Sequence, residues 1–219
     1  MAGGRSSRKS SVDAVLEEIY SLSGRELPQV AHIGVANGDD HSFFKWMTGM
    51  LKGPGKVEII EVKLASARAD VDAAKSLLRA SDVIFFSGGD VDEGMEWMNH
   101  HSLLAFFKEL QNEGKVFFGA SAGSIMLGTQ WVRWPDPDDD NSAELFPCMG
   151  LASVLCDTHA ENDGWDELQA AVELLDEGQQ GYGIPTGSTL KVLPDGTVSL
   201  MGKPSVSYRN VKGKAVLIP

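Results

Sequence analysis

The chain has 219 residues, a net charge of -12, 42% hydrophobic residues and 23% charged residues. A chain of this length and composition can bury a sizeable core, and we expect one α/β domain over residues 1–219, with residues 1–10 flexible. No apolar run approaches the roughly 18 residues that a membrane helix needs. Nucleic acid is disfavoured as a partner, because binding a polyanion depends on Lys and Arg.

The two cysteines, Cys148 and Cys156, have the spacing of neither a CxxC redox pair nor a zinc site, so we expect buried free thiols. Residues 1–9 are basic but lack the apolar core of a secretory signal. The sequence therefore predicts a cytoplasmic protein with no cofactor.

Helical patterns alternate with short β-branched runs along the chain, which indicates crossover units and a mainly parallel sheet between layers of helices. Turn signals such as Pro194-Asp195-Gly196 separate the last strands, which favours C-terminal β-hairpins. The expected helices cover 12–23, 42–51, 69–79, 165–175 and, as separate segments, 92–112. The expected strands cover 30–36, 57–62, 82–86, 115–118, 150–156, 183–185, 189–193, 197–201 and 215–218.

The segment Gly119-Ala120-Ser121-Ala122-Gly123 directly follows an apolar strand and precedes a helical pattern. A strand, a Gly-x-Ser-x-Gly turn and a helix form a nucleophile elbow, in which the strained turn lifts the serine hydroxyl clear of its neighbours. The N–H groups at the helix start could also stabilise an oxyanion. A glycine-rich packing turn would produce the same pattern, so the segment alone does not decide between the two.

A serine needs a base within hydrogen-bond reach to act as a nucleophile. His159 is the one histidine after Ser121, and both residues follow expected strands. Since functional groups gather at the carboxyl ends of parallel strands, we expect the two at one rim of the sheet. The other histidines are assigned to structure or solvent: His32, His41, His100 and His101.

Four segments spread along the chain resemble the dipeptidase E and cyanophycinase family of serine peptidases. GASAGSIMLG is similar to the family's nucleophile turn, and FFSGGD is similar to its Gly-Gly-Asn/Asp segment. The stretch from Gly150-Leu151 to Asp157-Thr158-His159 resembles its strand ending in Asp-x-His. Gly183-Ile184-Pro185, followed by 188–192, resembles a late segment of the family.

The resemblance implies a class I glutamine amidotransferase-like, flavodoxin-like fold and a peptidase that acts on short peptides. It further implies that Ser121 attacks the peptide carbonyl and that His159 acts as base and then as acid. The backbone N–H groups of Gly89 and Ala122 would hold the oxyanion. The positions assigned to substrate binding are Gly88, Asp90, Arg133 and Asp157.

An acidic side chain should orient His159, and the acidic loop at 134–141 offers four. Family members place their partner shortly after the serine, which favours Asp136, with Asp139 as the alternative. Asp136, Asp138 and Asp140 alternate as in the first half of an EF-hand loop. The second half does not match, because Asn141 and Pro147 occupy the glycine and glutamate positions, and we expect no metal.

The chain departs from the family in three places. Residues 160–167 contain four acidic residues and no arginine, although family members that recognise aspartyl substrates carry arginines there. A basic or neutral substrate group would therefore suit this site, unless Arg133 or Arg209 supplies a carboxylate clamp. Val91 replaces a residue that is often polar. Only Met1 and Ala2 precede Gly3-Gly4, so we expect the first strand to be absent or shortened. The exposed sheet edge would then favour pairing in a homodimer or mark a truncated chain.

Two other classes of function fit parts of the pattern. A catalytically inactive member of the fold could bind a ligand at the same cleft. A small esterase of the α/β-hydrolase fold shares the elbow, but that fold places its histidine near the end, whereas 60 residues follow His159 here.

Overall fold

The computed structural model describes residues 11–53 and 55–218, which form two compact units, one ending at Gly123 and one beginning at Ser124. The expectation of a single domain stays a prediction. Two expectations concern residues outside these ranges: the flexibility of residues 1–10 and the change to the first strand at Gly3-Gly4.

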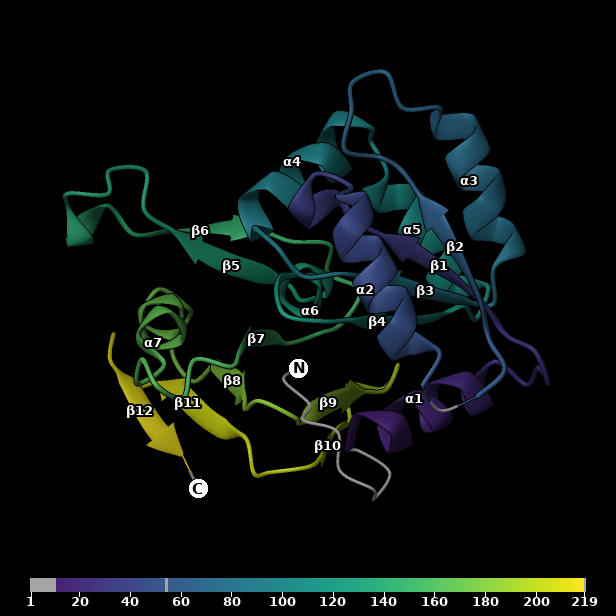
Figure 1. Ribbon diagram of the computed structural model, residues 1–219. Coiled ribbons are helices and arrows are strands. Elements are labelled where there is room, and N and C mark those ends of the chain that lie inside the picture. Colours follow the sequence, from purple (N-terminus) through teal and green to yellow (C-terminus); the bar gives the residue numbers. More distant parts are fainter. Residues whose placement is uncertain (1–10, 54, 219) are drawn as a thin grey trace. The chain divides into compact units, whose positions relative to one another are not determined.

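The first unit is built on a parallel sheet with the strand order β2-β1-β3-β4 (Figure 1). Both faces of its inner strands are covered, so β3 reads as a continuous apolar run and all four of its residues are buried. The bounds are β1 (Gln29–Ile33), β2 (Glu58–Val62), β3 (Val83–Phe86) and β4 (Val116–Gly119).

Helices cover both faces of this sheet, which gives three layers (Figure 1). His32 of β1 contacts Phe44 of α2 edge to face, so α2 lies on one side. Phe86 of β3 contacts Phe107 of α5 on the other side. The helices of this unit are α1 (Ser11–Leu22), α2 (His41–Leu51), α3 (Val71–Ala80), α4 (Val91–His100) and α5 (Leu104–Asn112).

Aspartates fix the starts of three of these helices. The carboxylates of Asp40, Asp70 and Asp90 accept hydrogen bonds from the backbone N–H groups at the first turns of α2, α3 and α4. Each carboxylate satisfies a donor that has no partner within its helix. The expected helix starts near 42, 69 and 92 agree with these caps.

The second unit contains a four-stranded sheet with the order β12-β11-β8-β7 and two separate hairpins, β5–β6 and β9–β10. Its helix α7 (Asp166–Glu173) packs on the sheet over Gly181 and Gly183, where no side chain would fit beneath Leu168 and Trp165. The strands are β5 (Gln130–Arg133), β6 (Glu144–Pro147), β7 (Leu155–Thr158), β8 (Gln180–Ile184), β9 (Thr189–Val192), β10 (Val198–Met201), β11 (Val206–Asn210) and β12 (Ala215–Ile218).

The α/β class, the parallel sheet and the C-terminal hairpins are confirmed, and so are the two buried free thiols. The strand expected at 150–156 begins only at Leu155, because backbone hydrogen bonds from Gly150 and Leu151 to Gly128 and Leu127 hold this stretch in turns. The sequence did not predict β5, β6 and β11. Their short runs are only partly buried, so their apolar pattern is weak.

Candidate active site

Three loops of the first unit meet at the carboxyl ends of neighbouring strands. Residues 34–37 follow β1, residues 87–90 follow β3, and residues 120–121 follow β4. Ala120 N donates to Phe86 O across 3.0 Å, which ties the last two loops together. In an open parallel sheet this is the edge at which ligands bind.

Ser121 occupies a strained turn between β4 and α6 (Ala122–Leu127). Its backbone has a φ of 54°, in the left-handed region that residues with a side chain rarely adopt, and the residue is half-buried. Gly123 N donates to Ala120 O across 3.1 Å and closes the turn. The predicted strand, turn and helix are therefore present, with the geometry of a nucleophile elbow.

The glycines around Ser121 are required by close packing. A Cβ on Gly123 would overlap the carbonyl oxygen of Phe86. A Cβ on Gly88 would lie 3.1 Å from Ser121 Cβ and 3.7 Å from Ser121 Oγ. These contacts explain why the segment uses small residues, and they bring backbone rather than side chains to the serine.

Gly89 has a φ of 149°, and a Cβ there would overlap the carbonyl oxygen of Ala36. The next residue, Asp90, donates its backbone N–H to that same oxygen and caps α4 through its carboxylate, which accepts from Glu93 N across 2.9 Å. The carboxylate predicted to bind substrate thus also has a structural task. The roles of Gly88, Gly89, Asp90 and Ala122 in binding stay predictions.

His159 follows β7 in the second unit and is exposed. Its backbone also lies in the left-handed region, with a φ of 50°, and its N–H donates to Ile184 O across 2.9 Å. The sequence analysis expected Ser121 and His159 at one rim of a single sheet. The strands that precede them, β4 and β7, belong to two separate sheets. The proton-sharing contact between the two residues stays a prediction.

Asp157, two residues before His159, is buried with 5% of its surface exposed. One carboxylate oxygen accepts from Thr158 N across 2.6 Å, and the other has no hydrogen-bond partner. Burial, together with the negative charges of Glu167 and Asp163, raises the pKa of Asp157 to about 7. This residue, assigned to substrate binding, is therefore placed beneath the surface next to the candidate base.

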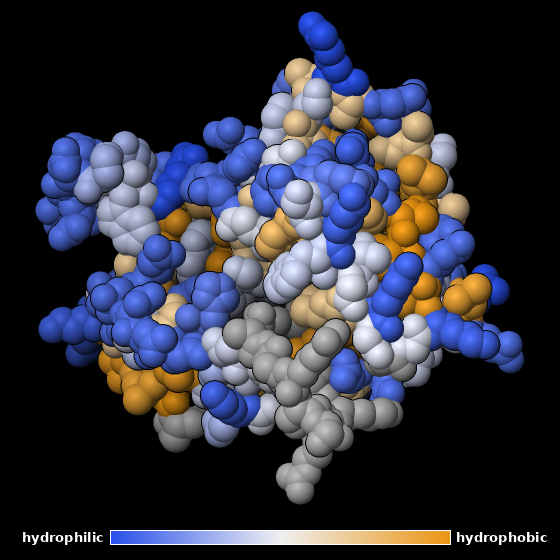
Figure 2. Space-filling model, viewed as in Figure 1, coloured by the Kyte–Doolittle hydropathy of each residue, from blue (hydrophilic) through white to orange (hydrophobic). Residues whose placement is uncertain are grey.

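The two candidate acids lie in the exposed loop between β5 and β6, which projects as the hydrophilic tip of a hairpin (Figure 2). Asp136 Oδ1 accepts from Asp138 N across 3.1 Å, and Asp139 Oδ1 accepts from Asn141 N across 2.9 Å. These local bonds shape the turn itself. Neither carboxylate is distinguished by them as the partner of His159.

The two arginines considered as substrate clamps have neighbours of their own. Arg133 contacts Glu144, with 2.7 Å between its Nη2 and Glu144 Oε1, across the β5–β6 hairpin. Arg209 donates to Gln180 Oε1 across 3.2 Å. To bind a substrate carboxylate, Arg133 would have to leave its exposed ion pair with Glu144. Such a pair contributes only about 0–1 kcal/mol to stability.

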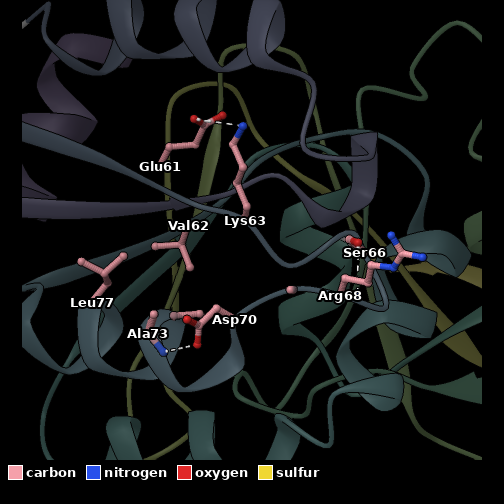
Figure 3. A pocket seen from close by; sticks show the side chains of 10 residues that line it. Glu61, Val62, Lys63, Ser66, Arg68, Asp70, Ala73 and Leu77 are labelled. Carbon is pink, nitrogen blue, oxygen red and sulfur yellow. Dashed lines mark hydrogen bonds and ion pairs between the residues drawn. The ribbon is translucent and has the colours of Figure 1, made fainter.

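A surface hollow of about 330 Å³ lies in the first unit between the end of β2 and the start of α3 (Figure 3). Glu61 pairs with Lys63 across 3.6 Å, and Asp70 accepts from Ala73 N across 2.9 Å. Most of the charged groups that line the hollow therefore already have partners within the protein. None of the residues predicted for catalysis lines this hollow.

The sequence analysis missed one residue of the three loops that follow β1, β3 and β4. Asn37 donates through Nδ2 to Ser87 Oγ across 2.9 Å and to Gly88 O across 2.8 Å. A polar residue in the loop after an inner parallel strand was the available signal, because such loops surround the ligand-binding edge.

The model of peptidase family S51 matches residues 1–200 of the sequence. The chain belongs to peptidase family S51. It is therefore a hydrolase of the peptidase class, and the resemblance to dipeptidase E is confirmed.

Named relatives agree with this assignment. The chain is 23% identical over 181 residues to peptidase E of Actinobacillus pleuropneumoniae serotype 3 (strain JL03), covering 80% of this chain and 74% of that protein. A solved structure named for peptidase E, from Listeria monocytogenes EGD-e, matches with a TM-score of 0.61 at 18% identity, covering 93% of this chain and 96% of the other. A peptidase from an acI-B1 actinobacterium matches with a TM-score of 0.64 at 16% identity, covering 94% and 88%. The likeness to these two structures is one of fold.

Proposed function

We propose that this S51 family member is a serine peptidase that hydrolyses short peptides through a Ser121-His159-acid mechanism. The observation that carries the proposal is the strained left-handed backbone of Ser121 in a turn between strand and helix, closely packed against Gly88. Other non-glycine residues of the described chain share this conformation, but Ser121 combines it with a place between a strand and a helix, at the carboxyl ends of the parallel strands.

In this mechanism His159 accepts the proton of Ser121 as the hydroxyl oxygen attacks the substrate carbonyl carbon. The oxyanion of the tetrahedral intermediate accepts hydrogen bonds from Gly89 N–H and Ala122 N–H, each worth about 10²- to 10³-fold in rate. The intermediate collapses when His159 donates the proton to the leaving amine, which leaves an acyl group on Ser121. A water molecule, deprotonated by His159, then hydrolyses this ester.

The side-chain preference of the substrate follows from charge. Residues 160–167, directly after His159, carry four carboxylates and no cationic side chain. An acidic substrate side chain would meet repulsion there, whereas a basic or neutral one would not. We therefore expect dipeptides with a basic or neutral residue at the N-terminus to be cleaved faster than those with aspartate.

The test is active-site labelling combined with a substrate panel. A fluorophosphonate probe should modify Ser121, and Ser121→Ala should abolish both labelling and dipeptide hydrolysis. Ser124→Ala is the matched control, because Ser124 lies in the same segment and keeps the backbone carbonyl oxygen that accepts from Cys156 Sγ. Full hydrolysis by Ser121→Ala would refute the assignment.

The same panel distinguishes the two rival functions. Short-chain esters cleaved much faster than every dipeptide would favour an esterase. A protein that neither reacts with the probe nor cleaves any peptide or ester would favour a ligand-binding member of the fold.

A cytoplasmic location and a homodimer belong to the same proposal. Among the described residues, no helix combines the length and the apolar character needed to cross a membrane. The expectation that nucleic acid is not a partner continues to depend on the charge of -12. Light scattering coupled to gel filtration would test the homodimer.

A further inference from the structure

The carboxamide of Asn37 joins the loop after β1 to the loop after β3. Its Nδ2 donates to Ser87 Oγ and to Gly88 O, and its Oδ1 accepts from Asp40 N across 3.2 Å. Because two acceptors lie on one side of the carboxamide and a backbone donor lies on the other, the positions of its nitrogen and its oxygen are assigned. Ser87 Oγ donates onward to Ile33 O across 3.2 Å, so it can accept from Asn37.

The bond to Gly88 O determines where the next N–H points. The peptide bonds of the described chain are trans, and in a trans peptide the C=O and the N–H point to opposite sides. Because Gly88 O is turned toward Asn37, the N–H of Gly89 is turned away from it. This N–H is the one proposed to hold the oxyanion.

The other side of Gly89 is also anchored by the loop that carries Asn37. Asp90 N donates to Ala36 O, and a Cβ on Gly89 would overlap this same oxygen. Both peptide groups that flank Gly89 are therefore held by consecutive residues, Ala36 and Asn37. A glycine with a φ of 149° would otherwise have many conformations open to it.

We propose that Asn37 is a positioning residue for catalysis, which holds the Gly88–Gly89 peptide so that the Gly89 N–H faces the developing oxyanion. This inference rests on the proposed function. Asn37 would not touch the substrate in this role. Its contribution would appear in the transition state, where a preoriented donor costs no reorganisation.

The substitutions Asn37→Ala and Asn37→Asp test the proposal. Alanine removes the donor, and aspartate keeps the size but places an acceptor against Gly88 O. Each should lower kcat by roughly 10- to 100-fold, less than the 10²- to 10³-fold expected when a donor itself is lost. KM should stay within about threefold, because the uncharged ground-state carbonyl gains little from this donor.

A second readout separates positioning from general stability. A peptide boronic acid forms a tetrahedral adduct with an active serine and so reports on the oxyanion site. Its affinity should fall by the same factor as kcat in both variants. Hydrogen exchange at residues 87–90 should become faster, whereas the melting temperature should match that of the surface control Asn99→Ala to within a few degrees.

Three outcomes would overturn the inference. Wild-type kcat and boronate affinity in both variants would refute it while leaving the proposed function intact. A lower kcat together with a higher KM and a lower melting temperature would show that Asn37 supports the fold in general and does not act specifically on the oxyanion site. A wild-type protein that shows no probe labelling and no hydrolysis would refute the proposed function, and the inference with it.

Discussion

Gly123 lies so close to the carbonyl oxygen of Phe86 that a methyl group on its Cα would overlap that oxygen. Phe86 ends β3, and Gly123 follows Ser121 by two residues. The contact thus fixes the distance between the strand that leads to Gly88-Gly89 and the turn that presents the candidate nucleophile. The second glycine of the elbow is a requirement of this approach.

Replacement of Gly123 by alanine should therefore destabilise the protein and inactivate it. The new methyl group can be accommodated only if β3 or the Ser121 turn moves, and we expect a loss of about 2–4 kcal/mol in the free energy of unfolding. Urea denaturation followed by circular dichroism would measure it. Labelling of Ser121 by a fluorophosphonate should fall at least tenfold.

The matched control is Gly49→Ala. Gly49 lies within α2, and a Cβ there would have nothing within 4 Å. Alanine is the better helix former by about 1 kcal/mol, so this substitution should raise the free energy of unfolding. If both substitutions had the same effect, the close approach would not be what constrains the turn.

The sequence predicted this turn because local patterns produce it. An apolar strand, small residues and a helical pattern are contiguous, and the aspartates at the helix starts act on neighbouring residues. It could not predict the hydrogen bond from Asn37 to Gly88 O, because the two residues are 51 positions apart and only the strand order brings them together. Nor could it predict the burial of Asp157, because its neighbour Gly183 and Trp165, which packs on Gly183, come from later segments of the chain.

The acid of the triad can be identified by two parallel substitutions. If Asp136 orients His159, Asp136→Asn should lower kcat by about 10⁴-fold, because the amide favours the wrong histidine tautomer. Asp139→Asn should then keep most of the activity. Both residues form similar bonds within their turn, so each variant serves as the control for the other. Full activity in both variants would exclude both residues as the acid of the triad.

Asp157 should make the second unit less stable as the pH rises. Its pKa is about 7 in the folded protein and about 4 when unfolded, so the folded state binds more protons between these values. Stability is then highest near pH 4 and falls by up to a few kcal/mol as the pH rises to 7 and above. Asp157→Asn keeps an acceptor for Thr158 N and should remove this contribution to the slope, as measured by the difference between variant and wild type in urea denaturation from pH 4.5 to 8. The exposed Asp166→Asn should leave the slope unchanged, and a slope that persists in Asp157→Asn would show that another group titrates.

His32 should have the opposite effect on the first unit. It is 2% exposed, lies against Phe44 and Phe85, and neither ring nitrogen has a hydrogen-bond partner. Burial lowers its pKa to about 4, although the backbone of His32 itself and, less strongly, the negative charge of Glu61 on β2 act in the other direction. The unfolded chain takes up a proton near pH 6.5 while the folded protein does not, so stability falls as the pH drops from 6.5 to 4.

Replacement by leucine tests this effect of His32, because a leucine of similar size fits the aromatic surroundings and cannot take up a proton. His32→Leu should abolish the loss of stability at low pH, which is on the order of 3 kcal/mol in the wild type. Hydrogen exchange of β1 between pH 4 and 7, corrected for the intrinsic effect of pH, would measure it within the first unit. The exposed His100→Leu is the control and should keep the wild-type dependence. If His32→Leu lost stability at low pH as steeply as the wild type, the buried imidazole would not be the group whose protonation opposes folding.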